Sequence, residues 1–396
     1  MKITGLRTFV VGNPKRATEG GRYFVFLKLV TEDGVEGLGE VYASTFGPTT
    51  VVRMIEEVFE RHVDGADPFR IERLWRDIYG RGYTGRPDVS LVAVLSGFEI
   101  ACWDLIGKAV GRPIYQLLGG LVRERLRTYT YLYAREGDPA DVYQDPQLGA
   151  RRAVEYAEMG FTALKFDPIW PYATLDPRQP TLEMLDHAAE YVRQVREAVG
   201  SRCDLLIGTH GQLTTSGAIR LAKRLEPYSP LWFEEPVPPE MPEEMATVAR
   251  ATTIPVATGE RLTTKYEFAR VLETGAASIL QPNLGRVGGL LEAKKIAGMA
   301  EAHYAQIAPH LYCGPVVGAA NIQLATCSPN FLILEGIERW DGFQAELLKR
   351  PIRWEAGYVI PPATPGLGIE LDETVAARYP YTGSELHQSP VYGALD

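Results

Sequence analysis

Short apolar runs alternate with amphipathic stretches from about residue 127 to about residue 350. The amphipathic stretches repeat apolar residues three and four positions apart, as helices with one buried face do; examples are Gly217–Leu225, Glu243–Ala251 and Gly289–His303. The apolar runs have the look of buried parallel strands and cover residues 127–133, 162–166, 203–207, 231–233, 255–257, 278–280, 305–308 and 331–334. Eight strand-then-helix units in about 210 residues predict a parallel (β/α)₈ barrel.

The chain before the barrel has a different pattern. A strand-like run at Phe24–Val30 enters a turn at Asp33-Gly34 and continues at Val35–Glu40, which is typical of a hairpin. Helical periodicity follows over residues 50–120. Strands followed by helices predict a small α+β domain.

The last segment is rich in Pro and Gly, and we expect it to pack back onto the first domain. The predicted organisation is an α+β domain at residues 1–125, a barrel at 126–350 and a returning segment at 351–396. A chain of 396 residues with 45% hydrophobic residues is long enough for two domains with substantial cores.

Composition narrows the class of protein. The net charge of −9 argues against nucleic acid as a partner. The four cysteines show no CxxC pair or zinc spacing, which favours buried thiols in a reducing compartment. The segment Met1–Thr4 lacks the apolar run of a secretory signal, and no uninterrupted apolar stretch is long enough to span a bilayer. We therefore expect a cytoplasmic protein with no membrane partner.

Polar or ionisable residues follow seven of the eight predicted strands. In a parallel barrel the carboxyl ends of the strands meet at one face, and that face carries the active site. In chain order, these residues are Lys165 and Asp167, Gly208 and His210, Glu234, Glu260, Gln281 and Asn283, His310, and Glu335. The convergence predicts a catalytic pocket at this end of the barrel.

Two of these residues, Glu234 and Glu260, are carboxylates on adjacent strands. Carboxylate oxygens are the protein ligands that Mg²⁺ prefers. A divalent ion on a substrate carboxylate would stabilise the enediolate that forms when the adjacent carbon loses its proton. The alternative reading is that each is a solvated acid on the barrel rim.

Such chemistry also needs a base, and β-elimination needs an acid for the leaving hydroxyl. His310 and His210 are the candidates, because histidine titrates near neutral pH; a structural role for each is the alternative. Lys165 would be a cation toward a carboxylate or a base, or it would form a rim salt bridge with Asp167. Glu335 would exchange a hydrogen bond with developing charge.

Several motifs of the chain match a known family. They are Ala101–Lys108 running into Pro113–Gly120, Phe233-Glu234-Glu235-Pro236, Gly259–Leu262, and Gln281-Pro282-Asn283 followed by Gly288-Gly289. On these motifs the chain resembles the enolase superfamily, in particular the mandelate racemase/muconate lactonizing enzyme branch and its sugar-acid dehydratases of the galactonate/gluconate type. The resemblance implies an α/β fold in which an N-terminal α+β capping domain covers a modified TIM barrel, (β/α)₇β. It also implies a Mg²⁺ ion, proton abstraction next to a carboxylate, and a homo-oligomer.

The same resemblance implies a role for each site residue. Glu234 and Glu260 look like the second and third metal ligands. His310 looks like the general base, and Glu335 like the group that stabilises the intermediate. His210 is similar to the acid that expels hydroxyl. The remaining two residues are Lys165, which matches the first lysine of a Lys-x-Lys motif, and Asp167, which stands where the second lysine would be.

Three positions depart from the family pattern. Gly208 stands where the first metal ligand is expected, so Mg²⁺ affinity should fall, or water or another side chain such as Asp167 should fill the gap. Asn283 replaces the Asp that pairs with the strand-seven histidine. Since an amide cannot stabilise an imidazolium as an anion does, His310 should be a weaker base, or a neutral donor or an acid. Gln212 replaces an Arg of close dehydratase relatives.

The substrate-binding residues are expected in loops. The Gly-rich segments Asn13–Arg22 and Tyr79–Asp88 are candidate specificity loops, and Arg81 and Arg86 are suited to a carboxylate or polyol. Residues near strand ends add amphipathic surface; these are Trp170, Tyr172 and Tyr312. A small hydroxylated acid is the predicted ligand.

The leading hypothesis is a Mg²⁺-dependent dehydratase that converts an aldonate-type sugar acid, such as galactonate or gluconate, to a 2-keto-3-deoxy acid. A racemase, epimerase or cycloisomerase acting on a hydroxy acid or sugar lactone would use the same enediolate. A catalytically impaired homologue that binds a sugar acid is the third possibility.

Overall fold

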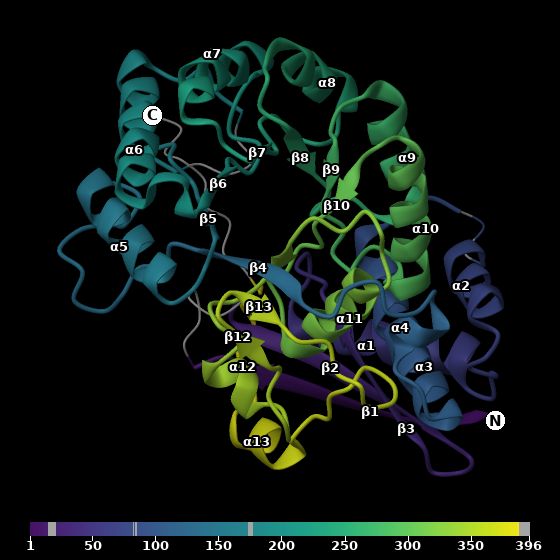
Figure 1. Cartoon of the computed structure of the whole chain (residues 1–396). Coiled ribbons are helices and arrows are strands. Elements are labelled where there is room, and N and C mark those ends of the chain that lie inside the picture. Colours follow the sequence, from purple (N-terminus) through teal and green to yellow (C-terminus); the bar gives the residue numbers. More distant parts are fainter. Residues whose placement is uncertain (15–20, 82, 84, 173–176, 388–396) are drawn as a thin grey trace.

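The computed structural model describes residues 1–14, 21–81, 83, 85–172 and 177–387. Parallel strands form a barrel with helices around it, and an α+β unit packs against the barrel (Figure 1). The barrel strands of the described residues are β4 (Leu126–Tyr131), β5 (Ala163–Phe166), β6 (Asp204–Gly208), β7 (Trp232–Glu234), β8 (Val256–Thr258), β9 (Ile279–Leu280), β10 (Gln306–Ile307) and β11 (Leu334–Glu335). Each coincides with or overlaps a predicted run, so the strand prediction is confirmed.

The strands pair in chain order from β4 to β10, and β11 returns to pair with β4. A bridge from Ile307 to Phe331 joins the last two strands and closes the barrel. One helix lies between each pair of consecutive strands: α5 (Pro146–Glu158), α6 (Leu182–Val199), α7 (Thr215–Leu225), α8 (Pro242–Ala251), α9 (Thr264–Thr274), α10 (Gly289–Ala302) and α11 (Pro315–Thr326). Between β11 and residue 353 the described chain forms one short helix, α12 (Gly342–Glu346), in place of an eighth barrel helix. The architecture is therefore the (β/α)₇β barrel implied by the resemblance, and the count of eight complete units is corrected.

The amino-terminal unit is an antiparallel sheet covered by helices. Its strands are β1 (Ile3–Gly12), β2 (Tyr23–Thr31) and β3 (Glu36–Val41), and the predicted hairpin is the β2–β3 pair. Its helices are α1 (Pro48–Val58), continued by a π-helical turn at Phe59–Val63, α2 (Ile71–Gly80), α3 (Val89–Val110) and α4 (Ile114–Leu117). By length and composition α3 would span a bilayer, but most of it is buried, as in the core helix of a globular unit.

The final segment returns to both units. A small hairpin of β12 (Trp354–Glu355) and β13 (Tyr358–Val359) pairs antiparallel with barrel strand β4, which the sequence pattern did not predict. The chain then forms α13 (Glu373–Arg378), and the N–H of Gly12 donates to the carbonyl of Tyr379 (2.6 Å). This second contact places the segment after α13 against the end of β1 in the first unit. The predicted boundaries at 125/126 and 350/351 lie before β4 and between α12 and β12.

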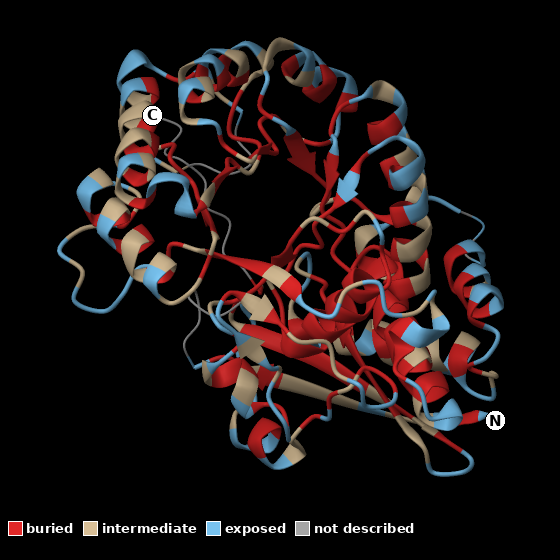
Figure 2. Cartoon of the chain, viewed as in Figure 1, coloured by how far each residue is buried: buried red, intermediate tan, exposed pale blue. Residues whose placement is uncertain are grey.

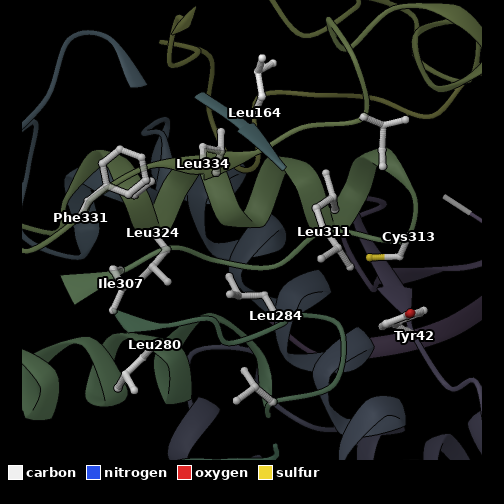
Figure 3. Packing of buried hydrophobic residues seen from close by; sticks show 14 of the residues in the cluster. Tyr42, Leu164, Leu280, Leu284, Ile307, Leu311, Cys313, Leu324, Phe331 and Leu334 are labelled. Carbon is white, nitrogen blue, oxygen red and sulfur yellow. The ribbon is translucent and has the colours of Figure 1, made fainter. Parts of the chain in front are cut away.

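Two layers of apolar side chains build the barrel. The inner layer contains Tyr129, Ala163, Leu206, Trp232, Ala257, Ile279, Ala308 and Ile333. The outer layer lies between strands and helices; Figure 3 shows members of it, among them Leu280, Ile307 and Leu334. Figure 2 shows buried residues along most of the strands and exposed residues on the outer faces of the helices. Because side chains alternate along a strand, the residue two positions beyond each inner-layer member also points inward.

Two glutamates of the amino-terminal unit, called the capping unit from here on, accept hydrogen bonds from the N-termini of barrel helices. Glu99 of α3 accepts hydrogen bonds from the backbone N–H groups of Leu290 (2.6 Å) and Leu291 (2.9 Å) at the start of α10. Glu40 of β3 accepts from Gly314 (2.5 Å) and from the N–H of Val317 in α11 (2.9 Å). A helix N-terminus has unpaired N–H groups and a positive dipole end, so these buried carboxylates join the two units.

We expect Glu99→Ala to lower the free energy of unfolding by about 2 kcal/mol, since it removes a helix cap and leaves buried N–H groups unpaired. The shift of the denaturant midpoint measures the loss. Glu301→Ala, at an exposed position in the last turn of the same helix, is the control and should change little. Equal stability of the two variants would contradict the capping role.

Candidate active site at the carboxyl end of the barrel

Alternation along the strands brings the predicted residues together. Five of the predicted strand-end residues lie two positions beyond an inner-layer residue and so face the barrel interior. They are Lys165 after Ala163, Gly208 after Leu206, Glu234 after Trp232, Gln281 after Ile279, and Glu335 after Ile333. Gly208 and Glu234 are also direct partners in the pairing of β6 with β7. The predicted convergence at this face is therefore present in the structure.

A buried ammonium group lies at the centre of this layer. Lys165 is fully buried, forms an ion pair with Glu234, and its Nζ is 3.8 Å from Oε1 of Glu335. The ring centroid of Tyr131 lies 4.8 Å from the same nitrogen. Burial alone would lower the pKa of Lys165, but the carboxylates, Glu234 first, raise it overall. Lys165 therefore remains a cation at neutral pH and cannot serve as a base.

Both carboxylate oxygens of Glu234 have a partner. Its Oε1 contacts the ammonium, and its Oε2 accepts a hydrogen bond from Nε2 of Gln281 (2.8 Å). Burial raises the pKa of Glu234, and Lys165 opposes that shift. The ammonium contact and the amide donor both stabilise the carboxylate form, so we assign the pair as charged.

Glu260 lies at the end of the next strand. Its Oε2 is 3.5 Å from Nε2 of His310 and has no hydrogen-bond partner in the described part of the chain. Burial alone would raise the pKa of Glu260, but the imidazole of His310 first, and then the cations of His210 and Lys165, lower it overall. This carboxylate is therefore ionised and has a free oxygen.

Asn283 fixes the tautomer of His310. The side-chain Oδ1 of Asn283 accepts a hydrogen bond from the N–H of Gly285 (2.9 Å), so its Nδ2 faces Nδ1 of His310 (2.9 Å). An amide nitrogen only donates, so Nδ1 must be the unprotonated ring nitrogen, and the proton of the neutral ring is on Nε2. Burial lowers the pKa of His310, which favours this neutral form. His310 thus presents a donor to the pocket.

The surroundings of His210 favour its protonated form, in contrast to those of His310. Its Nδ1 is 3.4 Å from Oδ1 of Asp167 and 2.8 Å from the hydroxyl of Tyr172. Burial alone would lower the pKa of His210, but the carboxylates of Asp167 and Glu260 raise it to about 9. The residue has a left-handed backbone (φ 47°), which is strained for a side chain of this size and is typical of functional sites. At neutral pH His210 is an imidazolium and can act as an acid.

The missing side chain at position 208 leaves room for Asp167. A Cβ atom on Gly208 would lie 2.2 Å from Oδ1 of Asp167. That oxygen is buried and has no hydrogen-bond partner among the described residues. The carboxylate expected on β6 is thus replaced in space by one from β5.

Some residues of the site were not singled out from the sequence. Tyr131 could have been found from its inward parity, two positions after the inner-layer residue Tyr129. Arg286 could not, because it lies in a loop. Its guanidinium carbon lies 3.8 Å from the ring centroid of Tyr42 in the capping unit, and Nη1 donates to the carbonyl of Glu260 (3.4 Å).

The comparisons with known families fit this geometry. Residues 10–119 match the N-terminal domain of mandelate racemase/muconate lactonizing enzyme, and residues 149–375 match the enolase C-terminal domain-like family. The chain belongs to the mandelate racemase/muconate lactonizing enzyme family of the enolase superfamily.

Members of this family with similar sequences or structures span the whole chain. A D-galactonate dehydratase from Ralstonia nicotianae is 38% identical over 385 residues, which cover 95% of this chain and 93% of the relative. A solved structure from Labrenzia alexandrii, described provisionally as a mandelate racemase/muconate lactonizing enzyme, is 63% identical with a TM-score of 0.95, covering 98% of this chain and 99% of its own. A mandelate racemase/muconate lactonizing enzyme-like protein from Roseovarius sp. TM1035 is 49% identical with a TM-score of 0.96, and both chains are covered fully.

Enolase superfamily enzymes typically use Mg²⁺, so the donor set here can be tested against that ion. Among the residues that the structure describes, no group of three or more His, Cys, Asp or Glu side chains is arranged to hold a metal. Mg²⁺ often takes only one or two protein carboxylates and completes its shell with water and substrate. Glu234 and Glu260 fit that smaller set, and the free oxygen of Glu260 supports it.

The predicted substrate-binding residues have different surroundings. Arg81 pairs with Asp77 at the exposed end of α2, and Arg86 is exposed; neither has a recorded contact with the barrel site in the described ranges. Trp170 is partly buried after β5, and the carbonyl of Tyr312 accepts from His387 (3.3 Å). In the two candidate specificity loops, residues 15–20, 82 and 84 lie outside the described residues. Substrate binding by these side chains stays a prediction.

The tautomer of His310 can be measured directly. In ¹⁵N-labelled protein we expect its Nδ1 to show the signal of an unprotonated nitrogen and its Nε2 that of a protonated one. Asn283→Asp should reverse the pattern, because a carboxylate accepts from Nδ1–H. His310→Gln assigns the signals, and a protonated Nδ1 in the unsubstituted protein would contradict the assignment.

Proposed function

We propose that this protein is a hydro-lyase that dehydrates a sugar acid of the aldonate type to a 2-keto-3-deoxy acid. The observation that carries the proposal is the contact of His210 with Asp167, which keeps the imidazole protonated. Elimination of a hydroxyl needs such an acid to protonate the leaving group. The D-galactonate dehydratases that resemble the chain over nearly its whole length support the same reaction and substrate class.

The remaining residues prepare the substrate for loss of its α-proton. The ammonium of Lys165 lies close to the carboxylates of Glu234 and Glu335, and it would stabilise the negative charge that develops on a substrate carboxylate. Mg²⁺, held by Glu234 and Glu260, would add a second positive charge to that carboxylate when bound. The Nε2–H of His310 is a fixed donor for a substrate oxygen. A cytoplasmic location and a homo-oligomeric assembly stay predictions.

The direct test is a screen of acid sugars, including D-galactonate and D-gluconate, with detection of 2-keto acids in the presence and absence of Mg²⁺. We expect keto acid from an aldonate and little without the ion. Solvent deuterium entering recovered substrate with no keto acid would favour a racemase or epimerase. Substrate binding in calorimetry with neither reaction would favour a catalytically impaired homologue.

The metal site has its own test. Gly208→Asp alone should not restore a strong site, because its Cβ would collide with Asp167. We expect the double variant Gly208→Asp/Asp167→Ala to bind Mg²⁺ at least about tenfold more tightly than Asp167→Ala, since a third carboxylate joins the site. Calorimetry with Mg²⁺ measures both. Equal affinities would show that position 208 is too far from the ion to act as a ligand.

A further inference from the structure

The hydrogen bond between Asn283 and His310 determines whether His310 can take the α-proton. His310 was expected to be the base, yet Asn283 donates to its Nδ1 and leaves only a donor on Nε2. Turning the amide over would place Nδ2–H against the N–H of Gly285, two donors facing each other. For His310 to accept a proton at Nε2, that arrangement would have to break. The α-proton therefore needs another acceptor.

Asp167 has the properties of that acceptor. It lies two positions after Lys165 on the inward face of β5, and 5% of its surface is exposed. Its Oδ1 faces Nδ1 of His210 at 3.4 Å and has no hydrogen-bond partner among the described residues, so one lone pair of this oxygen stays available. The absence of a side chain on Gly208 is what leaves space for this oxygen. The other carboxylates, Glu234 and Glu335, accept hydrogen bonds from Gln281 and from the N–H of Leu311 (2.6 Å).

His210 is the partner of this carboxylate. The 3.4 Å between its Nδ1 and Oδ1 of Asp167 is short enough for the negative charge of the carboxylate to stabilise the imidazolium. The groups that act on its charge come from three places: Asp167 and Lys165 on β5, Tyr172 after it, and Glu260 after β8. With Nδ1 directed at Asp167 and Tyr172, its Nε2–H is the proton available to a leaving hydroxyl.

We propose that Asp167 is the base of the reaction and that its carboxylate, paired with His210, keeps that residue protonated as the acid. The inference rests on the proposed dehydration. Oδ1 of Asp167 takes the α-hydrogen as a proton, and the C–H electron pair becomes the carbon–carbon double bond. The β-carbon–oxygen bond breaks, and the leaving hydroxide takes the proton of His210 to form water. The enol product rearranges to the keto acid. Asp167 then releases its proton to water, and Nε2 of His210 takes up a proton from water, which restores both groups.

The test compares Asp167→Asn with His310→Gln, using D-galactonate and D-gluconate deuterated at carbon 2. We expect Asp167→Asn to lower kcat and the release of deuterium by about 100-fold or more, the usual contribution of a general base, with KM nearly unchanged. His310→Gln keeps a donor and should retain deuterium release within about tenfold. Asp186→Asn, an exposed carboxylate paired with Arg224 on the outer helices, is the matched control and should behave as the unsubstituted protein.

Three results would overturn the proposal. The first is loss of deuterium release in His310→Gln with release retained in Asp167→Asn. The second is loss of Mg²⁺ binding in Asp167→Asn by calorimetry, which would make Asp167 a metal ligand. The third needs no substrate: Asp167→Asn should lower the pKa of His210 in a ¹⁵N titration, and an unchanged value would show that the two groups are not coupled. An unsubstituted protein that acts on neither sugar acid would contradict the substrate class, and the titration would still decide on the pair.

Discussion

The buried charge of Lys165 is the constraint on which the rest of the site depends. An isolated ammonium in a protein interior costs several kcal/mol, and only close carboxylates offset that cost. Glu234 and Glu335 supply them from β7 and β11, and Gln281 on β9 holds Glu234 in place. The carboxyl ends of β5, β7 and β11, which are distant in sequence, must therefore lie at the same height in the barrel for these charges to be balanced.

Much of this could be predicted from the sequence, because it depends on local periodicity. Apolar runs followed by polar ends located the barrel strands, and parity along the strands fixed which side chains point inward, as for Lys165 and Glu234. The tautomer of His310 could not be predicted, since it depends on which way the amide of Asn283 is held by Gly285. The pairing of β13 with β4 was also missed, because two-residue strands have no periodicity to read.

The absence of a side chain at Gly208 is linked to the position of the Asp167 carboxylate. The carboxylate of Asp167, directly after β5, occupies the space that a side chain at Gly208 on β6 would need. The local negative charge is therefore retained, but it comes from the neighbouring strand. A carboxylate in the new place contacts His210. The departure at 208 therefore bears on acid–base chemistry as much as on metal binding.

The buried glutamates at the interface have a consequence for how this architecture can diversify. Glu40 and Glu99 are covalently part of the capping unit, yet they complete helices of the barrel. Neither unit is a self-sufficient module, and recombination that joined this cap to a foreign barrel would need matching glycines such as Gly289, where a Cβ would meet Glu99 at 2.0 Å. New specificities in this lineage are therefore expected to arise by substitutions in loops and at strand ends rather than by exchange of whole domains.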